Sequence, residues 1–200
     1  MQNFIRFILV LSATLFVTQT QAAVSPVSLA LIPPVQFPPS DFGVTGLRLS
    51  LIYGHHRDMY GIDLGVLGNM TDQDSVGIAI AGGANVHYGM TTIVGLEVAG
   101  GVNYLKEKMN VYGLQAAGLF NWAEAESSVN GFQVAIQGNV AAHTTVRGAQ
   151  IGLYNRAKSV YGFQIGLVND ADDLHGLQIG LANFHRTGLF YVSPVLNVGF

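Results

Sequence analysis

The sequence contains no cysteine. This absence excludes disulfide bonds, thiolate metal sites and cysteine nucleophiles, because each of them needs a cysteine side chain. It also excludes a lipid anchor attached to an N-terminal cysteine. It does not argue against an oxidising compartment, because an exported protein can fold without disulfides.

Charged residues are scarce: they make up 10% of the 200 residues, against about 25% in an ordinary soluble domain. The net charge is −3 and no basic stripe is present, which argues against nucleic acid as a partner. Half of the residues are hydrophobic, yet no apolar run of about 18 residues follows the N-terminal segment. The combination favours a membrane β-structure over a helical one.

The N-terminal segment has the layout of a secretory signal peptide. Arg6 precedes an apolar core at residues 7–17, and small polar residues follow. The sequence therefore predicts a signal peptide over residues 1–23, cleaved after Ala22 or Ala23, and export of the protein.

Residues 24–41 hold five of the six prolines of the chain. Proline cannot donate a hydrogen bond to a strand ladder, so a proline-rich segment does not make a good central strand. We expect these residues to form an extended leader or an edge segment that precedes the main domain.

Residues 42–200 form a single domain of repeats, each of which contains a glycine followed by an apolar residue and then a polar or small one. The spacings between these glycines are 15, 16, 18, 18, 18, 17, 14 and 14 residues. Each unit alternates for about ten residues and then passes through a polar turn, which is the period-two pattern of a β-strand. With the closing segment, this predicts about ten strands. The glycines are Gly46, Gly61, Gly77, Gly95, Gly113, Gly131, Gly148, Gly162 and Gly176.

The two faces of the predicted strands differ in chemistry: one carries Leu, Ile, Val and Phe, and the other carries Gly, Ala and Gln. The charges inside strands fall on the second face, and a one-residue slip would place them among the leucines. Arg48 and Asp63 occupy matching positions after their glycines, which predicts a cross-strand ion pair. The expected inner, lumen-facing residues are Arg48, Asp63, Glu97, Gln115, Gln133, Gln150, Gln164 and Gln178.

Three architectures fit this alternation. In a transmembrane barrel, the leucine face meets lipid and the small residues fill a narrow interior. In a soluble barrel or sandwich, the leucine face is the core, although glycine and glutamine are then unusual on the wet face. In a β-solenoid, stacked glutamines form ladders, but drifting spacings fit coils of fixed cross-section poorly. The sequence favours an antiparallel up-and-down transmembrane β-barrel built from strand-turn repeats of 14–18 residues.

The closing segment alternates strictly and ends on an aromatic residue. It resembles the C-terminal strand of bacterial outer-membrane barrels, which implies recognition by the outer-membrane barrel assembly machinery during biogenesis. Pro194 departs from a good central strand and predicts a bulge or an edge there. The residues of this predicted assembly signal are Phe190, Val192, Leu196, Val198 and Phe200.

The repeats GFQIGLVN, from Gly162, and GLQIGLAN, from Gly176, resemble those of a family of uncharacterised bacterial proteins known only as surface-repeat-containing. The resemblance covers residues 28–200. It implies an exported, envelope-associated protein, and it brings no catalytic residue with it. The middle units depart from the pattern because those at Gly77 and Gly95 lack the glutamine.

The sequence offers little chemistry. His55 and His56 are adjacent, so on a strand they cannot both face one ion. The turn at residues 169–173 has oxygen ligands but lacks the loop length and closing Glu of a calcium motif. Ser50 and Ser193 have no histidine in register to activate them. We therefore expect no catalytic residue, no metal site and no cofactor.

The predicted function is an outer-membrane protein with a structural, interaction or narrow-pore role and with outer-membrane lipid as a partner. The alternative is a soluble periplasmic or secreted β-repeat binding module. No ligand can be named from the sequence.

Overall fold

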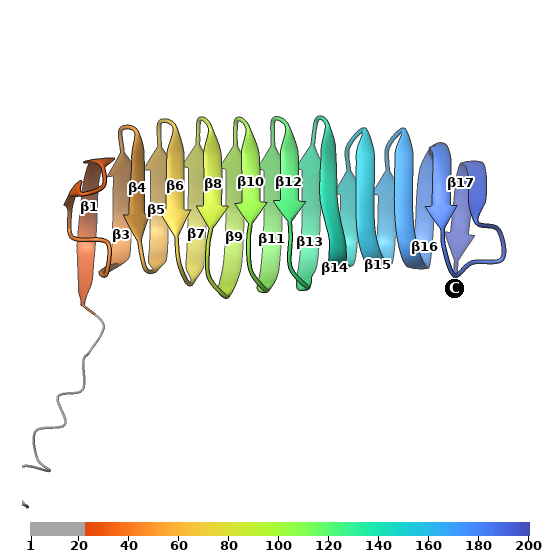
Figure 1. Ribbon diagram of the computed structural model, residues 1–200, viewed down its shortest axis with the longest axis horizontal. Helices are drawn as coiled ribbons and strands as arrows, with labels where there is room; N and C mark the ends of the chain where they lie inside the picture. The colour runs from red at the N-terminus through yellow and green to blue at the C-terminus, as the bar shows by residue number, and fades with distance from the viewer. Residues whose placement is uncertain (1–22) are drawn as a thin grey trace, which may run out of the picture.

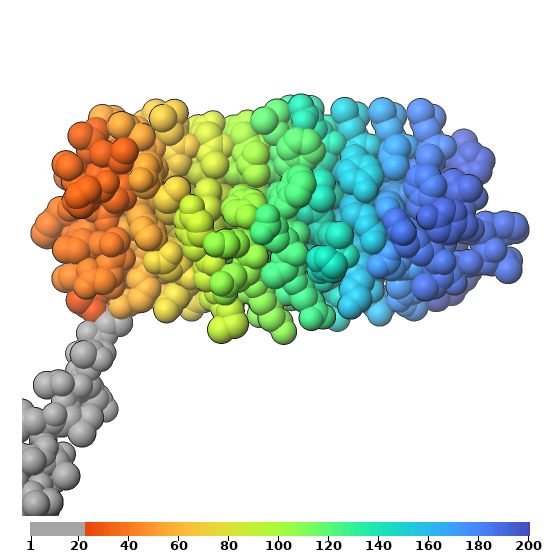
Figure 2. Space-filling view, in the orientation of Figure 1, coloured from red at the N-terminus to blue at the C-terminus, as the bar shows by residue number. Residues whose placement is uncertain are grey.

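The computed structural model describes residues 23–200, so the predicted signal peptide lies outside the described residues except for Ala23. The described chain winds into a flattened, parallel β-solenoid of about nine turns. Each turn adds one long strand and one short strand, and the turns follow one another along the body (Figure 1). Figure 2 shows an elongated block in which position along the axis follows position in the sequence.

The long strands of successive turns pair in parallel and form one sheet, here called the long-strand sheet. Its strands are aligned in register, so that each repeat glycine lies opposite the repeat glycine of the next turn. In the last turns, one continuous strand passes from the second sheet into this one. The long-strand sheet consists of β3 (Gly43–Ser50), β5 (Met59–Gly65), β7 (Ser75–Ala81), β9 (Thr91–Ala99), β11 (Met109–Ala117), β13 (Ser127–Ala135), the C-terminal parts of β14 (Gly138–Ile151) and β15 (Tyr154–Ile165) and the middle of β16 (Val168–His185).

The short strands stack in the same way into a second parallel sheet, here called the short-strand sheet. The two sheets enclose a narrow interior that is filled by side chains. The short-strand sheet consists of β4 (Tyr53–His56), β6 (Gly68–Thr71), β8 (Ala84–His87), β10 (Val102–Leu105), β12 (Phe120–Ala123) and the N-terminal parts of β14, β15 and β16.

The prediction of an antiparallel up-and-down barrel of about ten strands is wrong. The repeat strands are parallel, and 17 strands are present in residues 23–200. The drift in spacing reflects in part the polar turns that join a short strand to the next long one. Residues 106–108 form such a turn in an 18-residue unit, whereas Lys158 alone falls between the two sheets in a 14-residue unit. Side chains alternate between the two faces of a strand in parallel and antiparallel sheets alike. The alternation of apolar and small or polar residues therefore does not show the direction of the neighbouring strand.

The nine repeat glycines explain why one turn can lie so close to the next. All nine have φ between 125° and 149°, a region open to glycine and strained for other residues. A Cβ atom placed on Gly131 would lie 2.0 Å from the carbonyl oxygen of Gly113, one turn earlier. The stacking of coils therefore requires glycine at this position.

Each end of the solenoid carries a strand of opposite direction. At the N-terminal end, β1 (Val24–Ile32) pairs in parallel with β3, and β2 (Val35–Phe37) is antiparallel to β1. At the C-terminal end, β17 (Val192–Gly199) is antiparallel to β16, with a shift in register between Gly180 and Asn183. These strands end the regular parallel stacking on both sides.

The residues of the predicted assembly signal lie at the C-terminal end and are exposed. Phe190 precedes β17, and Phe200 ends the chain. Since β17 closes a solenoid and not a barrel, it does not meet the first strand at a seam. Recognition of this strand by an assembly machinery stays a prediction.

We predict that Gly131→Ala lowers the free energy of unfolding by about 3 kcal/mol, because the new Cβ meets a backbone oxygen and the backbone is strained. Gly43→Ala is the matched control, since Gly43 lacks a positive φ and its Cβ would meet the Arg57 side chain at 3.3 Å. Urea unfolding of the two variants measures the difference. Equal, small losses in both would show that the glycine column is not required.

Candidate functional site

A column of amide side chains runs through the interior beside the long-strand sheet. From Gln133 to Gln178, each Nε2 donates to the Oε1 of the glutamine one turn earlier, at 2.8–2.9 Å. Gln115 donates to Glu97 at 2.7 Å, and Asn197 of β17 donates to Gln178 at 3.0 Å. We call this column the glutamine ladder; it consists of Glu97, Gln115, Gln133, Gln150, Gln164, Gln178 and Asn197.

The glutamines expected to face a lumen therefore face the interior, where they are fully buried and bonded to one another. They line no barrel lumen, because each amide lies against the next at hydrogen-bond distance. A narrow-pore role loses its structural basis with the barrel.

A second column, which the sequence reasoning missed, lies beside the short-strand sheet. From Asn69 to Asn169, each asparagine Nδ2 donates to the Oδ1 of the asparagine one turn later at 2.7–3.0 Å and also to a backbone carbonyl, whereas Asn183 donates to backbone carbonyls alone. The signal was present, because every member follows its repeat glycine by seven or eight residues. This asparagine ladder consists of Asn69, Asn85, Asn103, Asn121, Asn139, Asn155, Asn169 and Asn183.

The glutamine ladder starts at a buried acid–base pair. His87 Nε2 lies 2.6 Å from Glu97 Oε1, and both side chains are almost fully buried. The other carboxyl oxygen of Glu97 accepts a hydrogen bond from Gln115. In this turn the carboxyl group therefore plays the part that a glutamine amide oxygen plays in the later turns of the ladder. Ala79 stands one turn earlier, so that Glu97 is not in contact with Asp63.

Arg48 and Asp63 form a buried ion pair across the neighbouring strands β3 and β5. Arg48 Nε donates to Asp63 Oδ1 at 2.7 Å, and its Nη2 donates to Oδ2. The guanidinium group also donates to the carbonyl oxygen of Met70 at 2.9 Å and contacts Thr71 Oγ1 at 3.2 Å. A buried, bidentate pair of this kind holds the first turns in register.

His56 lies against this pair and has a serine within reach. Its Nδ1 is 3.3 Å from Arg48 Nη1, and its Nε2 is 3.3 Å from Ser28 Oγ and 3.2 Å from the carbonyl oxygen of Pro38. Burial, and then the charge of Arg48, lower the pKa of His56 from 6.5 to about 4. Neutral His56 therefore accepts from Arg48 at Nδ1 and donates at Nε2, so it has no free lone pair to activate Ser28.

On the outer surface of the long-strand sheet, the two columns of side chains that follow the repeat glycines are apolar along the whole length of the sheet. We define the apolar face as the first and third positions after each repeat glycine, which point outward. None of these 18 positions carries a polar or charged side chain, and Phe132 and Phe163 are more than half exposed. The members are Leu47, Leu49, Ile62, Leu64, Ile78, Ile80, Leu96, Val98, Leu114, Ala116, Phe132, Val134, Ala149, Ile151, Phe163, Ile165, Leu177 and Ile179.

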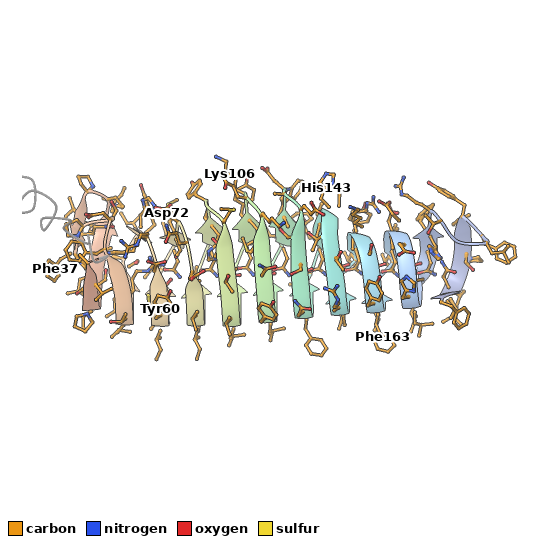
Figure 3. All side chains as sticks on the ribbon, turned by 90° about the horizontal axis from the view of Figure 1, so that it is seen from below. Phe37, Tyr60, Asp72, Lys106, His143 and Phe163 are labelled. Carbon is orange, nitrogen blue, oxygen red and sulfur yellow. The ribbon has the colours of Figure 1, made fainter. Side chains whose placement is uncertain are left out.

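Charged side chains outside the interior gather mainly at the polar turns, away from this face. Residues 57–58, 72–74, 106–108 and 124–126 lie there, and residues 172–173 lie at the corresponding place in β16, where the strand passes between the two sheets. In Figure 3, Lys106 and His143 project from the opposite side of the molecule to Tyr60 and Phe163. The body is therefore strongly amphipathic.

The comparisons with known proteins add no family: no family model, curated protein or solved structure matches the chain. Among residues 23–200, no helix is long and apolar enough to cross a membrane. No group of three or more residues in this part of the chain is placed to bind a metal ion.

We predict that His56 makes folding sensitive to mild acid. Above pH 6.5, His56 is neutral in both states; as the pH falls towards 4, the unfolded chain binds a proton that the folded one does not. The contribution to stability, about 3 kcal/mol, is lost over this range. The free energy of unfolding of wild type should therefore fall more steeply from pH 7 to pH 4.5 than that of His56→Asn.

His143→Asn is the matched control, because the His143 side chain is exposed and lies in β14 where the strand passes between the two sheets. It should follow the wild-type pH profile. If His56→Asn follows the wild-type profile as well, His56 does not titrate as described.

Proposed function

We propose that the chain is an exported, non-catalytic protein that attaches to the lipid surface of the cell envelope through its apolar face and presents its polar turns to water. The export and envelope parts of the proposal rest on the predicted signal peptide and on the resemblance to surface-repeat proteins. The lipid part rests on the outer surface of the solenoid.

The single observation that carries the proposal is the unbroken apolar face. Nine strands spaced about 4.8 Å apart give it a length of about 38 Å. Two columns of side chains make a patch of about 500 Å², as large as the largest apolar patches of ordinary monomers, which are often functional. At about 25 cal/mol per Å², covering it would contribute about 12 kcal/mol before the cost of association.

Tyrosines support a lipid surface in particular. Tyr60, Tyr112 and Tyr161 stand directly before their repeat glycines, in the column between the apolar face and the polar turns, and each is 40–49% exposed. Tyrosine is favoured where an apolar phase meets water, because its ring is apolar and its hydroxyl group is polar. Their position matches the boundary that a bilayer would create.

Attachment of this kind depends on the burial of apolar protein surface in lipid and not on attraction between charged residues and charged head groups. Without residues 1–23 the chain keeps 8 basic and 12 acidic residues, since only Arg6 is lost, and its net charge is −4. Within residues 23–200, no basic cluster faces outward beside the apolar face to attract anionic lipid. Binding to zwitterionic vesicles should therefore occur and should depend little on salt.

We predict that the exported protein floats with phosphatidylcholine vesicles in a density gradient, at both low and high salt. The double variant Phe132→Lys/Phe163→Lys should bind at least tenfold more weakly, because it places two charges in the apolar face. Ser128→Lys/Ser159→Lys is the control: it adds the same charges to β13 and β15 on the polar side and should bind within twofold of wild type.

Wild-type protein that stays with the aqueous fraction would contradict the proposal. So would equal losses in the two double variants, because binding would then not depend on where the charges lie.

A further inference from the structure

A shallow cavity of about 830 Å³, open to solvent along one side, lies at the N-terminal end of the apolar face. Five strands that are successive neighbours contribute to its wall: β2, β1, β3, β5 and β7. At about 4.8 Å per strand, it extends about 19 Å along the ladder. Its volume falls in the range of about 300–1,000 Å³ that is typical of small-molecule sites.

The wall of the cavity is made almost entirely of hydrocarbon. Its floor continues the apolar face through Leu49, Leu64 and Ile80, and β1 extends the same row with Leu29, the register partner of Leu49. Phe37 of β2, paired with Leu29, closes the row at the end of the sheet. The cavity is thus an end section of the apolar face, bounded by the hairpin of β1 and β2.

The polar groups near the cavity are not available to a ligand. The Gln36 side-chain amide donates a hydrogen bond to the carbonyl oxygen of His55 at 2.7 Å and accepts one from the backbone N–H of His55 at 3.2 Å. Ser50 is 3% exposed; its hydroxyl group has no hydrogen-bond partner among residues 23–200, but it points into the interior towards Gly54 and is shielded from solvent. A ligand with internal hydrogen-bonding groups would lose its bonds to water there without replacement, which is costly. The chemistry fits an unbranched hydrocarbon chain.

The lining also distinguishes a lipid from a free fatty acid. No lysine, arginine or histidine side chain lines the cavity, so a fatty-acid carboxylate would find no cation to pair with. The chains of one leaflet reach about 15 Å, half of a hydrocarbon core of about 30 Å, which the length of the cavity accommodates. A lipid chain could enter while its head group stays in water.

We infer that this cavity holds one acyl chain of a membrane lipid, drawn from the leaflet on which the apolar face rests. The inference rests on the proposed function, and it adds a defined site to a general surface attachment. The β1–β2 hairpin forms the end wall of the site, and the acyl chain lies across β1, β3, β5 and β7.

The test is calorimetric titration of the exported protein with dodecylphosphocholine below its micelle concentration. We expect saturable binding of one dodecylphosphocholine molecule per protein molecule. Leu64→Asp, which places a charge in the cavity wall, should weaken binding at least tenfold. Leu114→Asp is the matched control, because Leu114 belongs to the apolar face but lies outside the cavity. It should bind within twofold of wild type. Phe37→Ser, at the exposed end wall, should also weaken binding.

Three results would overturn the inference: no saturable binding, equal weakening by Leu64→Asp and Leu114→Asp, or tighter binding of dodecanoate than of dodecylphosphocholine. A wild-type dimer that Leu64→Asp dissociates would also overturn it, because a second copy would then fill the cavity. Vesicle flotation of the same variants separates the two claims. Flotation without saturable binding contradicts the cavity alone, whereas binding without flotation contradicts the proposed surface attachment.

Discussion

The close approach of each turn to the one before it governs this structure. Parallel strands in register bring identical residues together, so whatever occupies a position must tolerate a copy of itself about 4.8 Å away. Glycine meets that condition at nine positions where φ is positive and no Cβ atom fits. Glutamine and asparagine meet it in the interior, because an amide both donates and accepts and can therefore bond to its own copies along the whole ladder.

The same constraint explains why the ends are irregular. A ladder of amides leaves one unpaired group at each end, and a buried, unpaired polar group costs about 1–3 kcal/mol. Asn197 supplies the last donor at the C-terminal end, and Glu97 with His87 supplies the first acceptor. Ahead of that pair, Arg48 and Asp63 replace the amides with charges that satisfy each other. These charged pairs therefore join the first turns to one another through buried hydrogen bonds.

Much of the local structure could be predicted from the sequence. The alternation identifies strands, and it also predicts that residues such as Arg48 and Gln133 point to the interior. Strand direction could not be predicted this way, because alternation is identical in parallel and antiparallel sheets. The better signal was the recurrence of Gln two residues after the glycine in the last five units and of Asn seven or eight residues after the glycine in eight units, since only stacked copies require the same amide at the same place. The end cavity involves β1 and β2, whose pairing is not repeated elsewhere and leaves no periodic trace.

The stacking also shapes the proposed function, because it repeats one outward leucine or isoleucine into a face about 38 Å long. Spin-label distances along one outer column test the stacking most directly, and the lack of native cysteine allows clean labelling. Pairing Thr45→Cys with Val94→Cys, Asn130→Cys or Tyr161→Cys spans three, five and seven strand spacings. A solenoid predicts distances that rise to about 14, 24 and 34 Å. Distances that level off or fall from the second pair to the third would contradict it.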